Sequence, residues 1–193
     1  QWADLRRPID IDSVIARLQT PEGMAETRQW VMTATHYRRL FLHQLLDCTF
    51  EYGGRGGERG DPIVYVNVEA GLLAIRLALD AYPDSIRLAD SKGCLPLHIT
   101  CTQRLRLAGG SSTHYSWKEK IFKQLFNFML DKYPGGACTL TDSSQSVLSC
   151  VLDSSYTESP AADRDRDTIL MTLLDLFPSA AEIPDSDGRY PLH

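Results

Sequence analysis

The sequence predicts a mainly α-helical fold built from repeated units, and three observations lead to this prediction. A short motif occurs twice, as Asp90–His98 and as Asp185–His193. Each copy follows an aromatic–proline pair at the same distance, Tyr82–Pro83 in the first case and Phe177–Pro178 in the second. Between these landmarks, apolar residues recur at helical spacing. A repeated unit containing helices explains all three features.

A third aromatic–proline pair, Tyr133–Pro134, predicts a hidden copy of the motif. Counting from Pro134 without a gap gives Thr141–Ser149, which keeps the apolar pair Val147–Leu148 but lacks the Gly, Pro and His. We therefore expect the repeat to continue through the middle of the chain in degenerate form.

Each residue type in the motif has a physical role. Gly93 can adopt the positive φ that closes a tight turn, and Pro96 suits the first position of a helix because its missing N–H would have no partner there. Leu97 would then be the first buried residue of the helix, and His98 could hydrogen-bond back to the turn. The same roles fall to Gly188, Pro191, Leu192 and His193.

These residues resemble the ankyrin repeat, whose signature is a turn followed by Thr-Pro-Leu-His-x-Ala with a period of about 33 residues. Two departures stand out: Leu95 and Tyr190 occupy the place of the Thr, and the prolines of successive units lie further apart than this period. The resemblance implies an ankyrin-like solenoid of stacked β-hairpin/helix-turn-helix repeats, with an insertion in each. The units implied are 1–20, the second helix of a partial repeat, then 21–81, 82–132, 133–176 and the truncated start 177–193.

In chain order, Ile9–Leu18 has the caps and apolar spacing of a short helix, and Pro21 is a fourth landmark that leads to Phe41–His43, a diverged counterpart of the motif. The extra residues around Trp30–Met32 are expected to lengthen the hairpin of this unit. Later helices are predicted in pairs, a first and a second helix in each unit: Leu40–Cys48 and Val68–Leu79, Pro96–Arg104 and Trp117–Leu130, and Ser146–Leu152 and Asp167–Leu176.

The loops between paired helices hold the insertions, among them Leu107–Ser116 and Asp153–Arg166. They are rich in Gly, Ser, Pro or charge, and loop insertions cost little because closure entropy grows only logarithmically with length. The chain begins without Met and stops where a helix should start, so we expect a fragment of a longer protein.

Composition narrows the class of protein. The chain has 193 residues, of which 43% are hydrophobic, and a net charge of −5, so it can bury a core and lacks the basic excess of a nucleic-acid surface. No apolar run reaches membrane length; the best, Ala70–Leu79, is short and broken by Arg76. We expect a soluble monomer that binds neither nucleic acid nor membrane.

The five cysteines are odd in number and form no C-x-x-C pair. This favours small packing residues in a reducing, cytoplasmic compartment over a disulfide framework or zinc site, with secretion as the alternative. They are Cys48, Cys94, Cys101, Cys138 and Cys150.

Three stretches invite a chemical role, and each is better explained by structure. Gly53–Gly60 lacks the Lys and Ser/Thr of a phosphate-binding loop and is expected to be a flexible insertion. Asp163–Asp167 mimics a calcium loop, but Thr168 and Leu174 occupy the positions of the obligatory Gly and Glu, so we expect a solvated loop ending in an Asp helix cap. No catalytic motif is present, and neither an enzyme activity nor a cofactor is predicted.

The remaining stretch combines Cys94, His98 and Cys101, the last two on one helix face. The other copies lack this trio and no fourth ligand is evident, so we expect His98 to bond to its turn and Cys101 to pack in the core.

The resemblance implies a non-catalytic scaffold that binds partner proteins through its hairpin tips and concave face. Specificity would lie in residues that flank the turns without building them, although a plain solvated tip is the alternative for each: Arg38, Arg39, Ala89, Lys92, Cys94, Ser143, Gln145, Asp187 and Arg189. A second hypothesis is a regulatory or targeting part of a larger enzyme. A third is a purely α-helical solenoid, which predicts no strand pairing near Arg87–Cys94.

Overall fold

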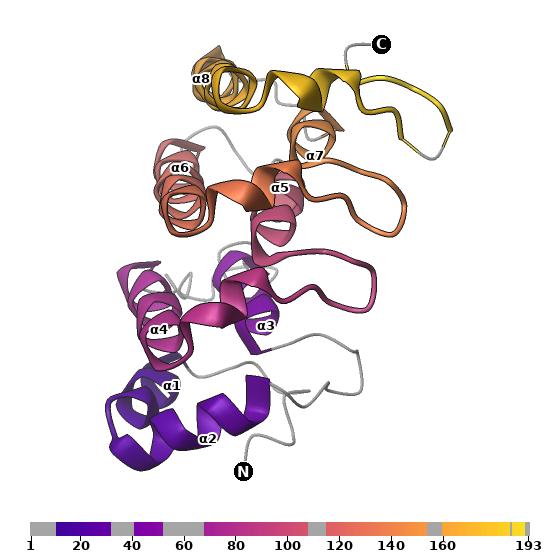
Figure 1. Cartoon of the computed structure of the whole chain (residues 1–193). Coiled ribbons are helices and arrows are strands. Elements are labelled where there is room, and N and C mark those ends of the chain that lie inside the picture. The colour runs from indigo at the N-terminus through magenta and orange to yellow at the C-terminus, as the bar shows by residue number, and fades with distance from the viewer. Residues whose placement is uncertain are drawn as a thin grey trace. The chain divides into compact units, whose positions relative to one another are not determined.

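The computed structural model describes residues 11–31, 41–51, 68–107, 115–153, 160–185 and 187–191, and helices dominate this part of the chain (Figure 1). The mainly α-helical class is therefore confirmed. The chain divides into two compact units, Gln1–Ser91 and Lys92–His193. The boundary falls inside the Asp90–His98 motif.

The first unit contains four α-helices and a 3₁₀ helix among its described residues. These are α1 (Ile11–Leu18), α2 (Pro21–Val31), α3 (Phe41–Glu51), α4 (Val68–Ala81) and η1 (Pro83–Arg87). Helix α4 is the centre of the unit, since α1, α2 and α3 all contact it. The buried faces follow helical spacing, as in Val14 and Leu18 of α1. The core therefore lies where the sequence periodicity placed it.

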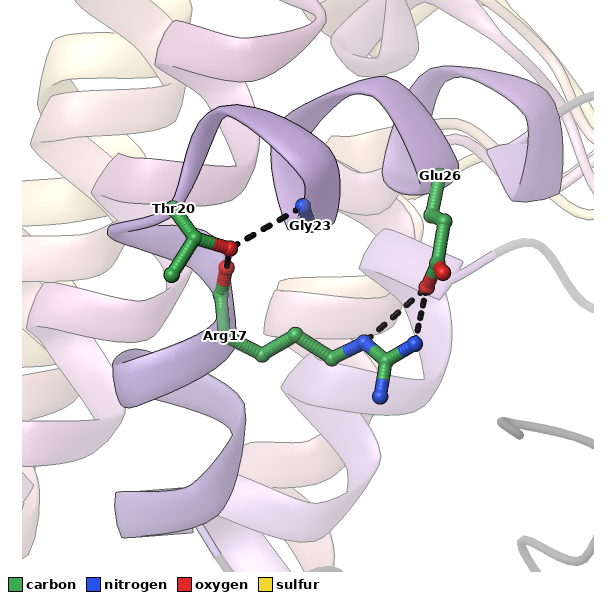
Figure 2. Close-up of polar contacts among 4 residues, drawn as sticks. All are labelled: Arg17, Thr20, Gly23 and Glu26. Atoms are coloured by element: carbon green, nitrogen blue, oxygen red, sulfur yellow. Dashed lines mark hydrogen bonds and ion pairs between the residues drawn. The ribbon is translucent and has the colours of Figure 1, made fainter.

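Helix α2 departs from the expectation set by its proline. Thr20 stands where the later units have an aromatic residue, and its hydroxyl accepts a hydrogen bond from Gly23 N at 3.1 Å (Figure 2). Met24 N then bonds to Thr20 O at 3.0 Å in the i→i−4 pattern of an α-helix. Because Trp30 and Val31 belong to this helix, the expectation that they lengthen a hairpin is wrong.

Contacts between α1 and α2 fix the start of the first unit. The Arg17 guanidinium pairs with the Glu26 carboxylate, with Nε to Oε2 at 2.9 Å (Figure 2). At Gly23 a Cβ would lie 1.9 Å from Arg17 O, so the two backbones approach too closely for any side chain. The turn between the helices thus depends on a glycine that sequence analysis gave no special role.

The second unit contains α5 (Pro96–Leu107), α6 (Tyr115–Lys132), η3 (Pro134–Cys138), α7 (Val147–Asp153), α8 (Pro160–Leu176) and η4 (Pro178–Glu182). Helix α5 contacts α6 and α7, and α6 contacts α8, so first helices pack on first helices and second on second (Figure 1). The core is built on α6, where Phe122 and Phe126 are fully buried with ring centroids 6.0 Å apart. All the predicted helices are present, with bounds that shift by a few residues, except at the start of α8.

Helix α8 begins at Pro160, well before the predicted start at Asp167. The expected loop Asp153–Arg166 is therefore wrong over its second half, and the acidic stretch Asp163–Asp167 is helical and no solvated loop. The physical reason is local, because Pro160 is acceptable in a first turn and Ala161 and Ala162 are strong helix formers. The alternating charges concealed this helix start.

Each aromatic–proline pair opens a 3₁₀ helix that sequence analysis did not predict. The aromatic residues Tyr82, Tyr133 and Phe177 share one conformation, with φ of −146°, −145° and −141°. In each case the residue three further on donates its N–H back to the aromatic residue's carbonyl, at 3.1, 3.0 and 3.0 Å. These donors are all small and buried: Ser85, Gly136 and Ala180. At Gly136 a Cβ would already lie 3.0 Å from the Tyr133 ring, which explains why the position must be small.

Candidate functional site

The three motif copies form turns of one conformation. Gly93, Ser144 and Gly188 have φ of 73°, 60° and 76°, in the left-handed region that glycine favours. Ser144 is the residue that counting from Pro134 aligns with Gly93. Its positive φ confirms the register predicted for the degenerate copy.

Each of the last two turns is closed by its first residue. Asp185 N donates to Arg189 O at 2.9 Å, and Thr141 N donates to Gln145 O at 3.0 Å. In a β-hairpin, the N–H of the last residue of the turn would donate to the carbonyl of the first residue. Here that N–H donates to the side chain of the first residue instead, from Arg189 N to Asp185 Oδ1 and from Gln145 N to Thr141 Oγ1. No strand occurs within the described ranges, so at these two places the predicted β-hairpins are tight turns that a side chain helps to close.

The predicted contact residues lie on these turns and differ in exposure. Ala89, Lys92, Ser143, Asp187 and Arg189 are exposed, whereas Cys94 and Gln145 are half-buried. Arg189 and Asp187 of the last turn form a loose ion pair, with Nη1 to Oδ2 at 3.6 Å and both side chains mostly exposed. Arg38 and Arg39 lie outside the described residues, as do the Gly53–Gly60 stretch and His193.

The first two turns are joined through their backbones within the second unit. Asp142 N donates to Lys92 O at 2.9 Å. A Cβ on Gly93 would lie 2.6 Å from Asp142 Oδ1 and 2.7 Å from Asp142 N, so the absence of a side chain permits this approach. At Gly188, in contrast, a Cβ would meet nothing within 4 Å. Lys92 and Ser143 are thus presented on adjoining turns.

His98 makes one hydrogen bond at the start of α5 and a second to the segment that precedes the next turn. Its Nδ1 accepts a hydrogen bond from Leu95 N at 3.2 Å, which confirms the predicted bond back to the turn. Its Nε2 lies 3.0 Å from Thr139 O, in the segment that follows η3. The ring is fully buried. His98 is therefore a structural residue that connects the start of α5 to the segment after η3, within the second unit.

The degenerate copy uses hydroxyls in the same places. Ser146 occupies the position of Leu95, and Ser149 that of His98. Ser146 Oγ accepts a bond from Ser149 N at 3.1 Å and lies 3.1 Å from Ser149 Oγ. This caps α7 in the way expected of a serine. Either arrangement starts a helix, but only the histidine extends to the following segment.

The cysteines offer no assembled site in the described part of the chain. Cys101 is fully buried on α5, as predicted, and Cys94 Sγ lies 4.0 Å from Lys92 O. Cys138 is exposed, although partial burial raises the pKa of its thiol and so disfavours the reactive thiolate. Among the described residues no group of three or more His, Cys, Asp or Glu side chains is placed to hold a metal ion.

Comparison with known proteins finds neither a family model nor a curated protein that matches this chain. Of the described helices, none combines the length and apolarity needed to cross a membrane.

Two backbone groups of the turn surface were missed by sequence analysis, Thr139 O and Asp142 N. Thr139 O contacts His98 and Asp142 N contacts Lys92, both in the preceding copy of the motif, so no local sequence pattern predicts these roles. Leu140, exposed beside them at 38%, also passed unnoticed because its side chain has no role in the motif.

Proposed function

We propose that this chain is a non-catalytic protein-interaction scaffold of ankyrin-like repeats, which binds a partner protein through its turns. The observation that carries the proposal is that one motif contains both buried residues that build the fold and an exposed residue that does not. Leu95, Leu97 and His98 are buried and build the unit, whereas Lys92, only three residues before Leu95, is exposed. Because the buried residues hold the turn in place, the exposed residues at its tip are not needed for stability.

The tips offer polar and charged groups of both signs. Lys92, Ser143 and Asp187 occupy corresponding places on successive turns, and Arg189 pairs with Asp187 on the last turn. Exposed ion pairs contribute little each, commonly less than about 1 kcal/mol, so affinity would come from several turns engaging one partner surface. Variation at the tips can then alter the choice of partner while the buried scaffold stays constant.

A matched pair of triple variants tests the proposal. The tip variant carries Lys92→Ala, Asp187→Ala and Arg189→Ala, and the control variant carries Arg76→Ala, Lys132→Ala and Asp175→Ala. The control removes the same charges from exposed positions on α4, α6 and α8. The protein most enriched by the full chain from an extract would be purified, and its dissociation constant measured for all three forms.

We expect the tip variant to weaken this complex by about tenfold or more, which corresponds to about 1.4 kcal/mol, and the control variant to bind like the parent chain. Thermal unfolding of each variant shows whether the fold is intact. Equal affinity of the tip variant and the parent chain, or an equal loss in both variants, would refute binding through the turns.

A further inference from the structure

The hydrogen bonds of His98 define where its ring carries a proton. Leu95 N–H can only donate, so Nδ1, 3.2 Å away, must be the unprotonated nitrogen. The proton of the neutral ring is then on Nε2, which donates it to Thr139 O at 3.0 Å. Both nitrogens are thereby committed in a ring with 0% exposure.

A second proton on this ring would break the arrangement at one defined point. An imidazolium carries a hydrogen on each nitrogen, and the one on Nδ1 would face the N–H of Leu95. The bond that ties the turn to α5 would be replaced by a repulsive contact between two donors. Burying the positive charge in the core adds a desolvation cost.

The elements that pack around the ring carry side chains of both charges. Helix α5 packs on α6 and α7. The described titratable or charged side chains of these elements, of the adjoining turns and of η3 include Cys101, Lys123, Asp131, Lys132, Cys150, Lys92, Cys94, Tyr133, Cys138 and Asp142. The carboxylates among them, Asp131 and Asp142, are exposed. Asp90, the first residue of the turn that leads into α5, is a buried carboxylate.

We propose that His98 is an acid-labile clasp: protonation of its ring at Nδ1 releases the Leu95 amide and opens the start of α5, where only the Nε2–H bond to Thr139 O can then persist. The unfolded or opened chain binds this proton near the ordinary histidine pKa of about 6.5. Protons therefore favour the opened form, and the clasp is intact above that pH and weakens as the pH falls through it.

The degenerate copy provides an internal comparison. Ser146 and Ser149 cap α7 with hydroxyls, which do not titrate in this range. Acid should therefore loosen the start of α5 and leave the start of α7 closed. If the proposed binding through the turns is correct, the same opening would also displace Lys92 relative to the next turn.

Amide hydrogen exchange of the full chain, followed residue by residue by NMR, tests this proposal without any partner. After correction for intrinsic exchange rates, the protection of the Leu95 amide should fall about tenfold or more between pH 7.5 and 5.0, within the limit of tenfold per pH unit that one proton sets. The protection of Ser149 should change much less. In the parent chain, the ¹⁵N shifts of the His98 ring should show the Nε2–H form at pH 7.5.

Two substitutions sharpen the test. Gln can accept and donate without taking up a proton, so His98→Gln should remove the pH dependence at Leu95. His43→Gln changes a histidine of the first unit that is also fully buried, and should leave that dependence in place. An Nδ1–H tautomer in the parent chain, or unchanged Leu95 protection at pH 5.0, overturns the proposal even if His98→Gln fails to fold.

Discussion

At the scale of the residue, the three positive-φ positions predict three different responses to substitution. Gly188→Ala should cost about 1 kcal/mol, since its added Cβ meets only the backbone penalty. Gly93→Ala should cost clearly more, because its Cβ also collides with Asp142. Ser144→Gly should stabilise the chain by up to about 1 kcal/mol, as glycine relieves the strained φ. Urea unfolding followed by circular dichroism measures all three.

The order of these effects is the decisive result. Equal losses for Gly93→Ala and Gly188→Ala would mean that the first two turns do not approach each other through Asp142. A loss of stability in Ser144→Gly would mean that the serine side chain contributes more than its backbone strain costs. The sequence suggested a turn at each site, but only packing distinguishes Gly93 from Gly188.

At the scale of the element, Pro21 follows a threonine and opens an α-helix, whereas the three prolines that follow an aromatic residue open 3₁₀ helices. Thr20→Ala should cost about 1 kcal/mol by removing the cap from Gly23 N, and should fray the first turn of α2. Glu26→Gln should cost less, because the side chains of Arg17 and Glu26 are 40% and 44% exposed and such pairs contribute little. The free energy of unfolding of each variant tests this order.

A larger loss in Glu26→Gln than in Thr20→Ala would show that the ion pair, rather than the cap, holds α2 in place. The comparison also explains why Pro21 misled the sequence analysis. Tyr82, Tyr133 and Phe177 make no side-chain cap bond and their prolines open 3₁₀ helices, whereas Thr20 has a hydroxyl in reach of Gly23 N.

At the scale of the whole molecule, the sequence predicts one continuous array, and cooperativity tests that prediction. Leu97→Ala should destabilise the second unit by about 2–5 kcal/mol through a buried cavity, while Lys92→Ala on the exposed turn should change stability by less than about 0.5 kcal/mol. In a continuous array, the loss should also lower hydrogen-exchange protection in α4 of the first unit.

Unchanged protection in α4 alongside a destabilised second unit would indicate two independently folding units instead of one array. A Leu97→Ala variant as stable as Lys92→Ala would contradict the assigned register itself.

The sequence alone determined the helical class, the positions of the turns and the register of the degenerate copy. These features depend on local requirements, such as positive φ at Gly93 or a proline at the first position of a helix, and residue types state such requirements directly. Thr141–Ser149 could be aligned by counting because its conformational needs survive the loss of its glycine.

Tertiary structure decided what each local element became and which residues it joined. Asp185 and Thr141 draw the returning N–H to their side chains, so the hairpins became closed turns. His98 was expected to bond to its own turn, yet its second bond reaches Thr139, 41 residues later in the chain. Such a partner is set by tertiary packing within the second unit, and no spacing within a single motif encodes it.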